Sequence, residues 1–371
     1  MTEKELIPYN RLIIIGNGFD LSQGLKSCYN DFLIDYFGKA CHNVFRNSNY
    51  KDEFIEITLN YGFGDTSWPD KYNEYNKVIQ FVRDPTLLEG IIYHSELFKE
   101  LISSKPKENW IDIEKFYFKK LKQIYEEGES QNSYSKVKKL NEFLDNISKK
   151  LNDYLNNIHS VFDYNKNEAT ENYIDHYYRK LEDKDLAFIY RRNKSGYRNS
   201  VLNRVMLLNF NYTNVLEKAI MQTKNSSISE IVNIHGEVNS EINPIIFGYG
   251  DDTSEEYRKL ELRDEDEYLR NIKSSKYSRT NNYHKMLSFL DKQNFEVFIV
   301  GHSCGLSDKT LLRTIFEHEK CLAIKIFHHQ GYNEHLNKGI AISRHFSDKV
   351  KMREKVLPFD ENAKIIQRVV K

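Results

Sequence analysis

The stretch "RLIIIGNGFDLSQG", residues 11–24, starts with a short apolar run that ends at a glycine. The run has the length and β-branched composition of a buried strand, and Ser22 reads as the start of a helix. A strand, a glycine turn and a helix present backbone N–H groups to an anion such as pyrophosphate. However, Gly16-x-Gly18-x-x-Leu21 lacks the third glycine of the dinucleotide fingerprint, and tight turns also carry glycine for steric reasons. The turn alone leaves both interpretations open.

Further apolar runs extend this pattern along the chain. Strands are predicted at 12–15, 205–208, 231–234 and 297–300, with less pronounced runs at 244–247 and 323–327. Three of the four main runs lead into predicted helix starts, at Ser22, Thr213 and Ser307. Strands that feed helices through such turns predict an α/β fold with a parallel sheet covered on both faces.

The segment between the first two main runs has a helical pattern. Apolar residues recur at the 3.6-residue period at 113, 116, 117, 121 and 124, and again from 140 to 162. The near-heptad spacing fits a dimer seam, although a helical hairpin that packs on itself is the simpler interpretation. We therefore expect one domain over residues 1–371 that contains a helical insert at about 40–200.

The charge balance limits the partners that the chain attracts. Lys plus Arg and Asp plus Glu both number 54, which argues against recruitment by duplex DNA or by an anionic membrane. Residues 190–204 are basic with two interleaved tyrosines, a composition that contacts single-stranded nucleic acid in some proteins. A solvated connector is the preferred interpretation.

Cysteine usage and hydropathy argue against a metal module and a membrane span. The four cysteines form no C-x-x-C pair, and His328, His329 and His335 lack regularly spaced acidic or thiolate partners. No metal is expected.

The N-terminus lacks a signal-peptide apolar core and no apolar run approaches ~18 residues, so a cytoplasmic protein is expected.

Polar residues follow the main runs at the point where each ends. Asn211 follows the second run, His235-Gly236 the third, and Gly301-His302-Ser303 the fourth. Each has an ordinary explanation alone, as an Asx turn, a packed histidine or a helix cap. Because the carboxyl ends of parallel strands line one crevice, their coincidence predicts a common ligand site.

These motifs, taken together and in order, carry a family resemblance. "IIIGNGFDLSQGLKSCYNDF", "NWIDIE" (109–114), "LLNFNYTNVLE", "HGE", "PIIFGYGDD" and "FIVGHSCGLSDKTLL" resemble the AbiH family of bacteriophage abortive-infection proteins. That family is a distant relative of the sirtuin-like NAD-binding proteins. The resemblance implies a Rossmann-like, sirtuin-like sheet that binds NAD.

The resemblance also implies roles for individual residues. Asn211 and His235 fall on the catalytic pair of sirtuin-like NAD hydrolases. Thr213 stands where relatives carry aspartate, and whether Asp20 replaces that carboxylate is open. The residues implied to contact the nucleotide are Gly16, Asn17, Gly18, Phe19, Asp20, Thr213, Gly301, Ser303 and Asp308.

The predicted activity is hydrolysis of NAD at its nicotinamide–ribose bond during an antiphage response. Asn211 would hold the ribose and water, and His235 would serve as the base. A non-catalytic nucleotide sensor is the first alternative. The second is a serine esterase, because Gly301-His302-Ser303-Cys304-Gly305 matches G-x-S-x-G. Against it, Asp348 and Asp360 have no histidine after them, and Asp308 lies on the helix predicted to follow the motif. Further candidate partners are a phage-derived trigger or a partner defence protein, and other copies of the chain in a homo-oligomer.

Overall fold

The computed structural model describes residues 7–47, 49–58, 91–103, 110–128, 131–162, 175–178, 185, 200–221 and 228–367. The chain folds into two compact units. The first comprises residues 1–25, 155–262 and 271–371, and the second comprises residues 26–154 and 263–270. The second unit overlaps the segment that the sequence predicts as an insert.

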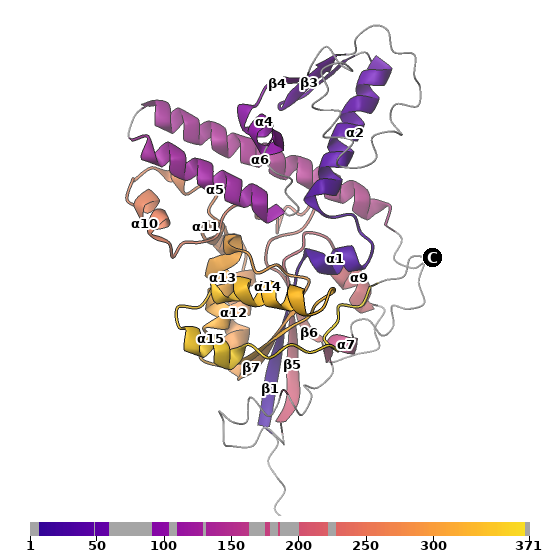
Figure 1. The fold of residues 1–371 in the computed structure, drawn as a ribbon, viewed down its shortest axis with the longest axis vertical. Coiled ribbons are helices and arrows are strands. Elements are labelled where there is room, and N and C mark those ends of the chain that lie inside the picture. Colours follow the sequence, from indigo (N-terminus) through magenta and orange to yellow (C-terminus); the bar gives the residue numbers. More distant parts are fainter. Residues whose placement is uncertain are drawn as a thin grey trace, which may run out of the picture. The chain divides into compact units, whose positions relative to one another are not determined.

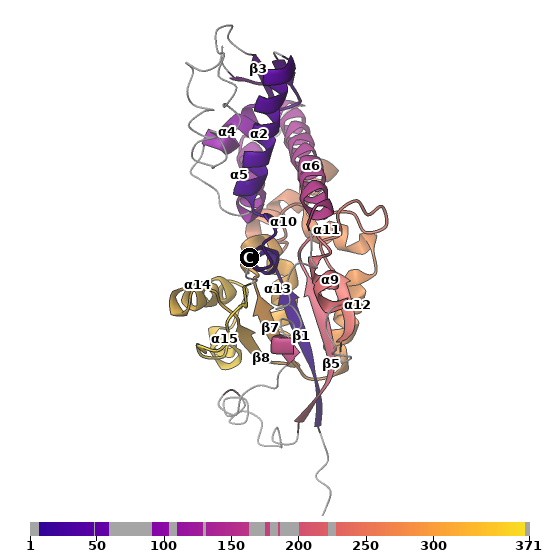
Figure 2. The same ribbon diagram turned by 90° about the vertical axis from the view of Figure 1, so that its right-hand side faces the viewer.

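The first unit is built on a five-stranded sheet in which all neighbouring strands are parallel. In spatial order its strands are β6 (Ile228–Asn233), β5 (Ser200–Asn209), β1 (Ile7–Ile15), β7 (Phe295–Val300) and β8 (Cys321–Ile326). Figure 1 shows β5, β1 and β7 side by side, and Figure 2 shows β1 running along β5. The chain adds strands outward from β1, first toward β6 and then toward β8, which is the order of a Rossmann-like sheet. The predicted α/β fold is confirmed, and its strand order reverses between β1 and β7.

Helices cover both faces of this sheet, as the apolar strands require. Leu12 and Ile14 of β1 pack into one core cluster, and Ile13 and Ile15 pack into the other. The first cluster includes side chains from α12 (Asn282–Lys292), α13 (Lys309–Phe316), α14 (Tyr332–Ser343) and α15 (Lys349–Lys355). The second includes side chains from α1 (Asn17–Ser22), α7 (Asp175–Tyr178) and α9 (Val215–Met221).

One predicted helix start is wrong. Helix α1 begins at Asn17, directly after Gly16, and Ser22 is its last residue. The hydroxyl of Ser22 donates to the carbonyl oxygen of Phe19 inside the helix, so it caps nothing at the N-terminus. The reason is that the chain turns from strand to helix within a single extended glycine. The other two predicted starts lie two residues before α9 and α13.

The run at 244–247 is not a strand, whereas the run at 323–327 largely coincides with β8. Pro244 makes only an isolated bridge with Glu237, because proline lacks the N–H that a ladder needs. Ile246 and Phe247 are buried in a loop instead. The connection from β6 to α12 also contains α10 (Glu255–Glu261), α11 (Lys273–Lys276) and the 3-10 turns Asp266–Tyr268 and Tyr277–Arg279.

The second unit combines helices with a small antiparallel sheet that the sequence analysis did not predict. The strands are β2 (Asn49–Lys51), β3 (Ile55–Thr58) and β4 (Ile91–Tyr93). They have only three or four residues, too few to show a clear alternation. The helices are α2 (Tyr29–Asn47), α4 (Glu96–Ser103), α5 (Trp110–Glu126) and α6 (Gln131–Ser160). Helix α6 extends beyond residue 154, where the first segment of the unit ends.

The predicted helical stripes are confirmed in α5 and α6. Tyr117 and Leu121 of α5 and Leu140 and Leu144 of α6 are all buried. The hydroxyl of Tyr117 donates to Oδ1 of Asn141 at 2.7 Å, which joins the two helices within one chain, as a hairpin requires. Among the described residues, no helix is long and apolar enough to cross a membrane.

Candidate functional site

Glycine and polar residues follow the carboxyl ends of four neighbouring strands in the first unit. Gly16 follows β1, Asn211 lies two residues beyond β5, His235 two beyond β6, and Gly301 directly after β7. Because the strands are parallel, these ends lie at one edge of the sheet. The side chain of Asn211 donates from Nδ2 to the carbonyl oxygen of Gly16 at 3.2 Å. The structure therefore brings residues from separate predicted motifs to one place.

The glycines form a close junction between two loops. The N–H groups of Gly16 and Gly18 donate to the carbonyl oxygens of Val300 and Gly301, at 3.0 and 2.9 Å. A Cβ atom on Gly18 would lie 2.7 Å from Cα of Gly301, whose own φ is +68°. Steric contact thus accounts for these glycines, and both N–H groups already have acceptors. Phosphate binding by Gly16, Asn17 and Gly18 stays a prediction.

Asp20, in the first turn of α1, is the centre of a buried hydrogen-bond cluster. Its Oδ1 accepts from Nδ2 of Asn211 at 2.8 Å, and its Oδ2 accepts from the hydroxyl of Thr213 at 2.5 Å. Burial raises the pKa of Asp20 to about 7, against the lowering effect of these two hydrogen bonds. A carboxyl group therefore lies within hydrogen-bond distance of Thr213.

An asparagine pair beneath Asn211 was not predicted. Asn209 and Asn233 are the last residues of β5 and β6 and face each other, with Nδ2 of Asn209 donating to Oδ1 of Asn233 at 2.9 Å. Oδ1 of Asn209 also accepts from the backbone N–H of Asn211 at 3.1 Å. The sequence signal for this pair is an asparagine directly after the run at 205–208 and another within the run at 231–234. The pair fixes the backbone that carries Asn211.

Asp308 occupies the N-cap position of α13, but its side chain makes no capping hydrogen bond and instead contacts three ionisable side chains. Its Oδ1 lies 2.7 Å from Nζ of Lys273 and 3.5 Å from Nε2 of His235, and its Oδ2 lies 3.5 Å from Nε2 of His302. All four residues are buried. Burial and the neighbouring Lys273 lower the pKa of His235 to about 3, so this ring is neutral at pH 7. Burial alone would raise the pKa of Asp308, but Lys273 and the histidines lower it instead.

Two of these residues were not predicted as site residues. His302 follows β7 and is named at that strand end together with Gly301 and Ser303 but is given no role, whereas Lys273 lies in α11 and follows no strand. The ring of Phe210 joins the cluster, with its centroid 4.8 Å from that of His235 and 4.3 Å from that of His302. The Tyr277 ring lies parallel to His235 at 6.5 Å.

The geometry around Ser303 does not match a nucleophile elbow, in which the nucleophile itself occupies the strained position of the turn. Gly301 and Cys304 have positive φ, whereas Ser303 does not. Within the described part of the chain, no histidine is hydrogen-bonded to Ser303: His302 faces Asp308, and His345 bonds the carbonyl oxygen of Cys304. Ser303 is exposed beside the cluster.

The histidines after β8 are occupied by structural contacts. His328 accepts at Nδ1 from the N–H of Gly331 and lies 3.1 Å from the carbonyl oxygen of Asp360 through Nε2. His335 packs its ring against Phe359. In the described ranges, no three His, Cys, Asp or Glu side chains are placed to hold a metal ion together.

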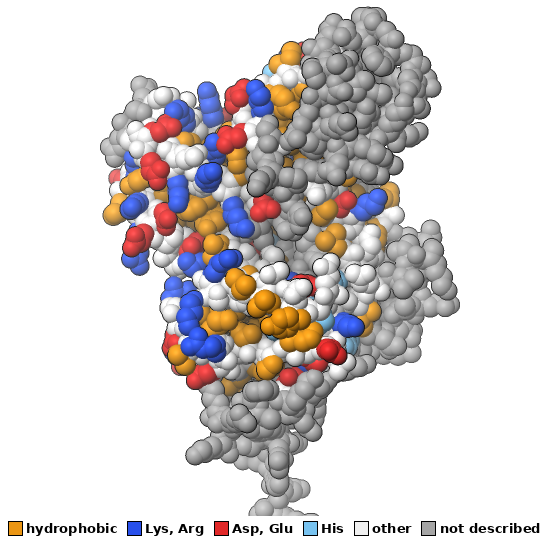
Figure 3. Space-filling view, in the orientation of Figure 1, with side chains coloured by type: hydrophobic (Ala, Val, Ile, Leu, Met, Phe, Trp, Pro, Cys, Tyr) orange, Lys and Arg blue, Asp and Glu red, His pale blue; other side chains and the backbone are white. Residues whose placement is uncertain are grey.

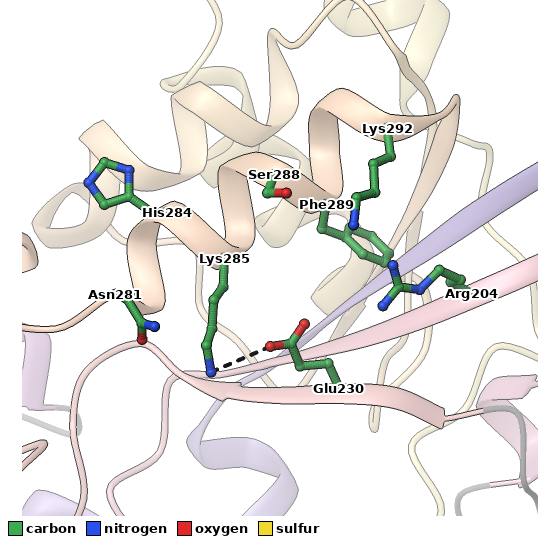
Figure 4. Close-up of a pocket in the computed structure, with 8 residues that line it drawn as sticks. All are labelled: Arg204, Glu230, Asn281, His284, Lys285, Ser288, Phe289 and Lys292. Atoms are coloured by element: carbon green, nitrogen blue, oxygen red, sulfur yellow. Dashed lines mark ion pairs between the residues drawn. The ribbon is translucent and has the colours of Figure 1, made fainter.

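Two surface features of the first unit lie outside this cluster. A groove of about 300 Å³ runs along α12, where Lys285 pairs with Glu230, and Arg204 and Phe289 also line it (Figure 4). Exposed apolar side chains follow α14 at Tyr332, Leu336 and Ile340, and Figure 3 shows hydrophobic side chains over this helix. Neither feature contains a residue that the sequence predicts for the site.

The sheet order and the polar cluster at its carboxyl edge define a Rossmann-like α/β protein. The family model described as "Bacteriophage abortive infection AbiH" matches residues 12–329, so the chain belongs to the AbiH family. The match spans every strand-end residue from Gly16 to Asp308. The family description indicates a role in phage abortive infection. No curated protein matches the chain.

Proposed function

We propose that this AbiH protein acts in phage abortive infection by binding NAD at the strand-end cluster and hydrolysing its nicotinamide–ribose bond. The observation that carries the proposal is the pairing of Asn211 with the Asp20 carboxyl at the same sheet edge as a neutral, buried His235. This edge lies at the reversal of strand order, where open α/β sheets bind their ligands.

The surroundings of Asp20, Asn211 and His235 suit the chemistry that NAD cleavage requires. Cleavage of the bond develops positive charge on the ribose, and the ionised carboxyl of Asp20 would stabilise that charge. The amide of Asn211 would orient the ribose or the attacking water, and a neutral His235 has a ring nitrogen able to accept a proton. Asn211, Asp20 and His235 are each at least nine-tenths buried, so substrate entry requires the site to open. We therefore expect low activity in uninfected cells and a phage-derived trigger that opens the site.

Incubation of the purified protein with NAD, with free nicotinamide measured by chromatography, tests the activity. His235→Ala and Asn211→Ala should each lower cleavage by at least ~10²-fold. His284→Ala removes an exposed histidine on α12 and should leave cleavage unchanged. Equal activity in all three variants would reject the assigned roles. A plaque assay on the same variants links cleavage to protection.

A non-catalytic nucleotide sensor is the second candidate, because the low pKa of His235 makes it a weak base and the site is closed. Calorimetry with NAD separates the two functions. Binding without nicotinamide release, in the presence of a phage lysate as well as without it, would favour the sensor. The esterase alternative predicts ester hydrolysis that Ser303→Ala abolishes, and we expect none.

A further inference from the structure

Lys273 is the buried cation of the strand-end cluster. Its side chain is 2% exposed and its Nζ lies 2.7 Å from Oδ1 of Asp308. Its backbone is also held, because its N–H donates to the carbonyl oxygen of Tyr249 at 2.9 Å. A buried lysine that is fixed at both ends has a defined position relative to its partner.

Asp308 in turn lies close to two imidazole rings. It lies 3.5 Å from Nε2 of His235 and 3.5 Å from Nε2 of His302. Nδ1 of His302 accepts from the N–H of Cys304 at 3.0 Å, so neutral His302 carries its proton on Nε2, facing Asp308. One carboxylate therefore bridges a lysine and two histidines that follow different strands.

We propose that Lys273 is a positioning residue of this site, which holds Asp308 against both histidines and offsets the charge of Asp308 beside His235. The ionisable groups that face His235 are Lys273, Asp308 and His302, and the Tyr277 ring lies parallel to it. The ammonium group disfavours a second positive charge on His235, and it also offsets the carboxylate that favours one. The catalytic consequence rests on the proposed NAD hydrolysis, whereas the effect on His235 does not.

The charge state of His235 can be followed by NMR titration of the histidine rings, with His235→Gln used for assignment. In Lys273→Met, Asp308 is no longer balanced, so the pKa of His235 should rise by about one unit or more. Asp308→Asn removes the carboxylate that favours a charged His235 and leaves the burial of the ring and the repulsion by Lys273. His235 should therefore stay uncharged across the whole pH range in which the protein is folded. The two variants should thus change the pKa of His235 in opposite directions.

Lys309→Met is the matched control. Lys309 is adjacent to Asp308 in sequence but pairs with Asp251 at 3.0 Å, and its loss should leave the His235 titration unchanged. Equal shifts in Lys309→Met and Lys273→Met, or shifts in the same direction for Lys273→Met and Asp308→Asn, would overturn the proposal.

Two further variants cover the case in which Lys273→Met does not fold. Lys273→Arg keeps the charge and should keep His235 uncharged. Lys273→Met/Asp308→Asn removes both buried charges, so the pKa of His235 should be lower than in Lys273→Met. If Lys273→Met is unfolded, the pKa of His235 in the double variant should be higher than in Asp308→Asn. A charged His235 in Lys273→Arg would contradict the proposal. If the wild type cleaves NAD, the acid limb of kcat/KM should shift from variant to variant together with the pKa of His235. KM should change less than kcat. If the wild type does not cleave NAD, the proposed function fails while the titration still decides the role of Lys273.

Discussion

Nδ2 of Asn211 lies 2.8 Å from Oδ1 of Asp20, a contact between residues 191 positions apart. It joins the end of β5 to the first turn of α1. Both side chains are buried, and the same Nδ2 donates to the carbonyl oxygen of Gly16. The orientation of the candidate catalytic amide therefore depends on a carboxyl group whose pKa burial raises to about 7. The stability of the protein and the geometry of the site therefore both depend on Asp20.

Asp20→Asn should change how stability depends on pH. The pKa of Asp20 is raised from 3.8 to about 7 on folding, so the folded state binds a proton that the unfolded state releases, and stability falls as pH rises between those values. The variant lacks this loss and should be more stable than the wild type at pH 8, by at most about 4 kcal/mol. An asparagine keeps both hydrogen bonds if the Thr213 hydroxyl turns to accept. Thermal unfolding at pH 5 and pH 8 measures the difference, and the exposed Glu241→Gln is the control.

Thr213→Val should destabilise the protein above pH 7. The substitution preserves shape but removes the donor to Oδ2 of Asp20, which leaves a buried carboxylate oxygen without that bond. The expected cost is about 1–3 kcal/mol, measured by urea unfolding at pH 8. Thr213→Ser retains a hydroxyl and should recover most of it. If Thr213→Val does not change the stability, solvent must reach Asp20.

Gly301→Ala should be much more damaging than an alanine at another glycine. A Cβ atom there would lie 2.3 Å from the N atom of Phe19, and φ is +68°. The expected loss is at least about 2 kcal/mol. A Cβ atom on Gly339 of α14 would meet nothing within 4 Å beyond its own helix backbone, and Gly339→Ala should stabilise by about 0.5–1 kcal/mol. Similar melting temperatures for both variants would show that the loop junction is easily rearranged.

Arg11→Met should destabilise the sheet by leaving a buried carboxylate unpaired. Arg11 of β1 and Glu296 of β7 are register partners, and Nε of Arg11 donates to Oε1 of Glu296 at 2.6 Å. Removing one member of such a pair costs about 3–5 kcal/mol. The double variant Arg11→Met/Glu296→Leu should recover most of this in chemical unfolding. A double variant as unstable as the single one would show that Arg11 acts mainly through its hydrogen bond to the carbonyl oxygen of Tyr177.

Local sequence patterns were enough to identify the strands of the parallel sheet and the helices α5 and α6. The run at 12–15 marks β1, and the periodic apolar residues mark α5 and α6, because burial of one face imposes a short-range repeat. The same reasoning found Asn211 and His235, since each closely follows a strand. It failed at Ser22 and at 244–247, where a one-residue turn and a proline loop replaced the expected elements.

The pairings within the site were decided only by the tertiary structure. Thr213 bonds Asp20 across 193 residues and Lys273 bonds Asp308 across 35, and no repeat or motif links either pair. Strand order brings such residues together, and burial then sets their charge: it raises the pKa of Asp20 and, with Lys273, lowers that of His235. A residue's chemistry can be read from its type, but its ionisation depends on solvent exclusion and on neighbours that lie far away along the chain.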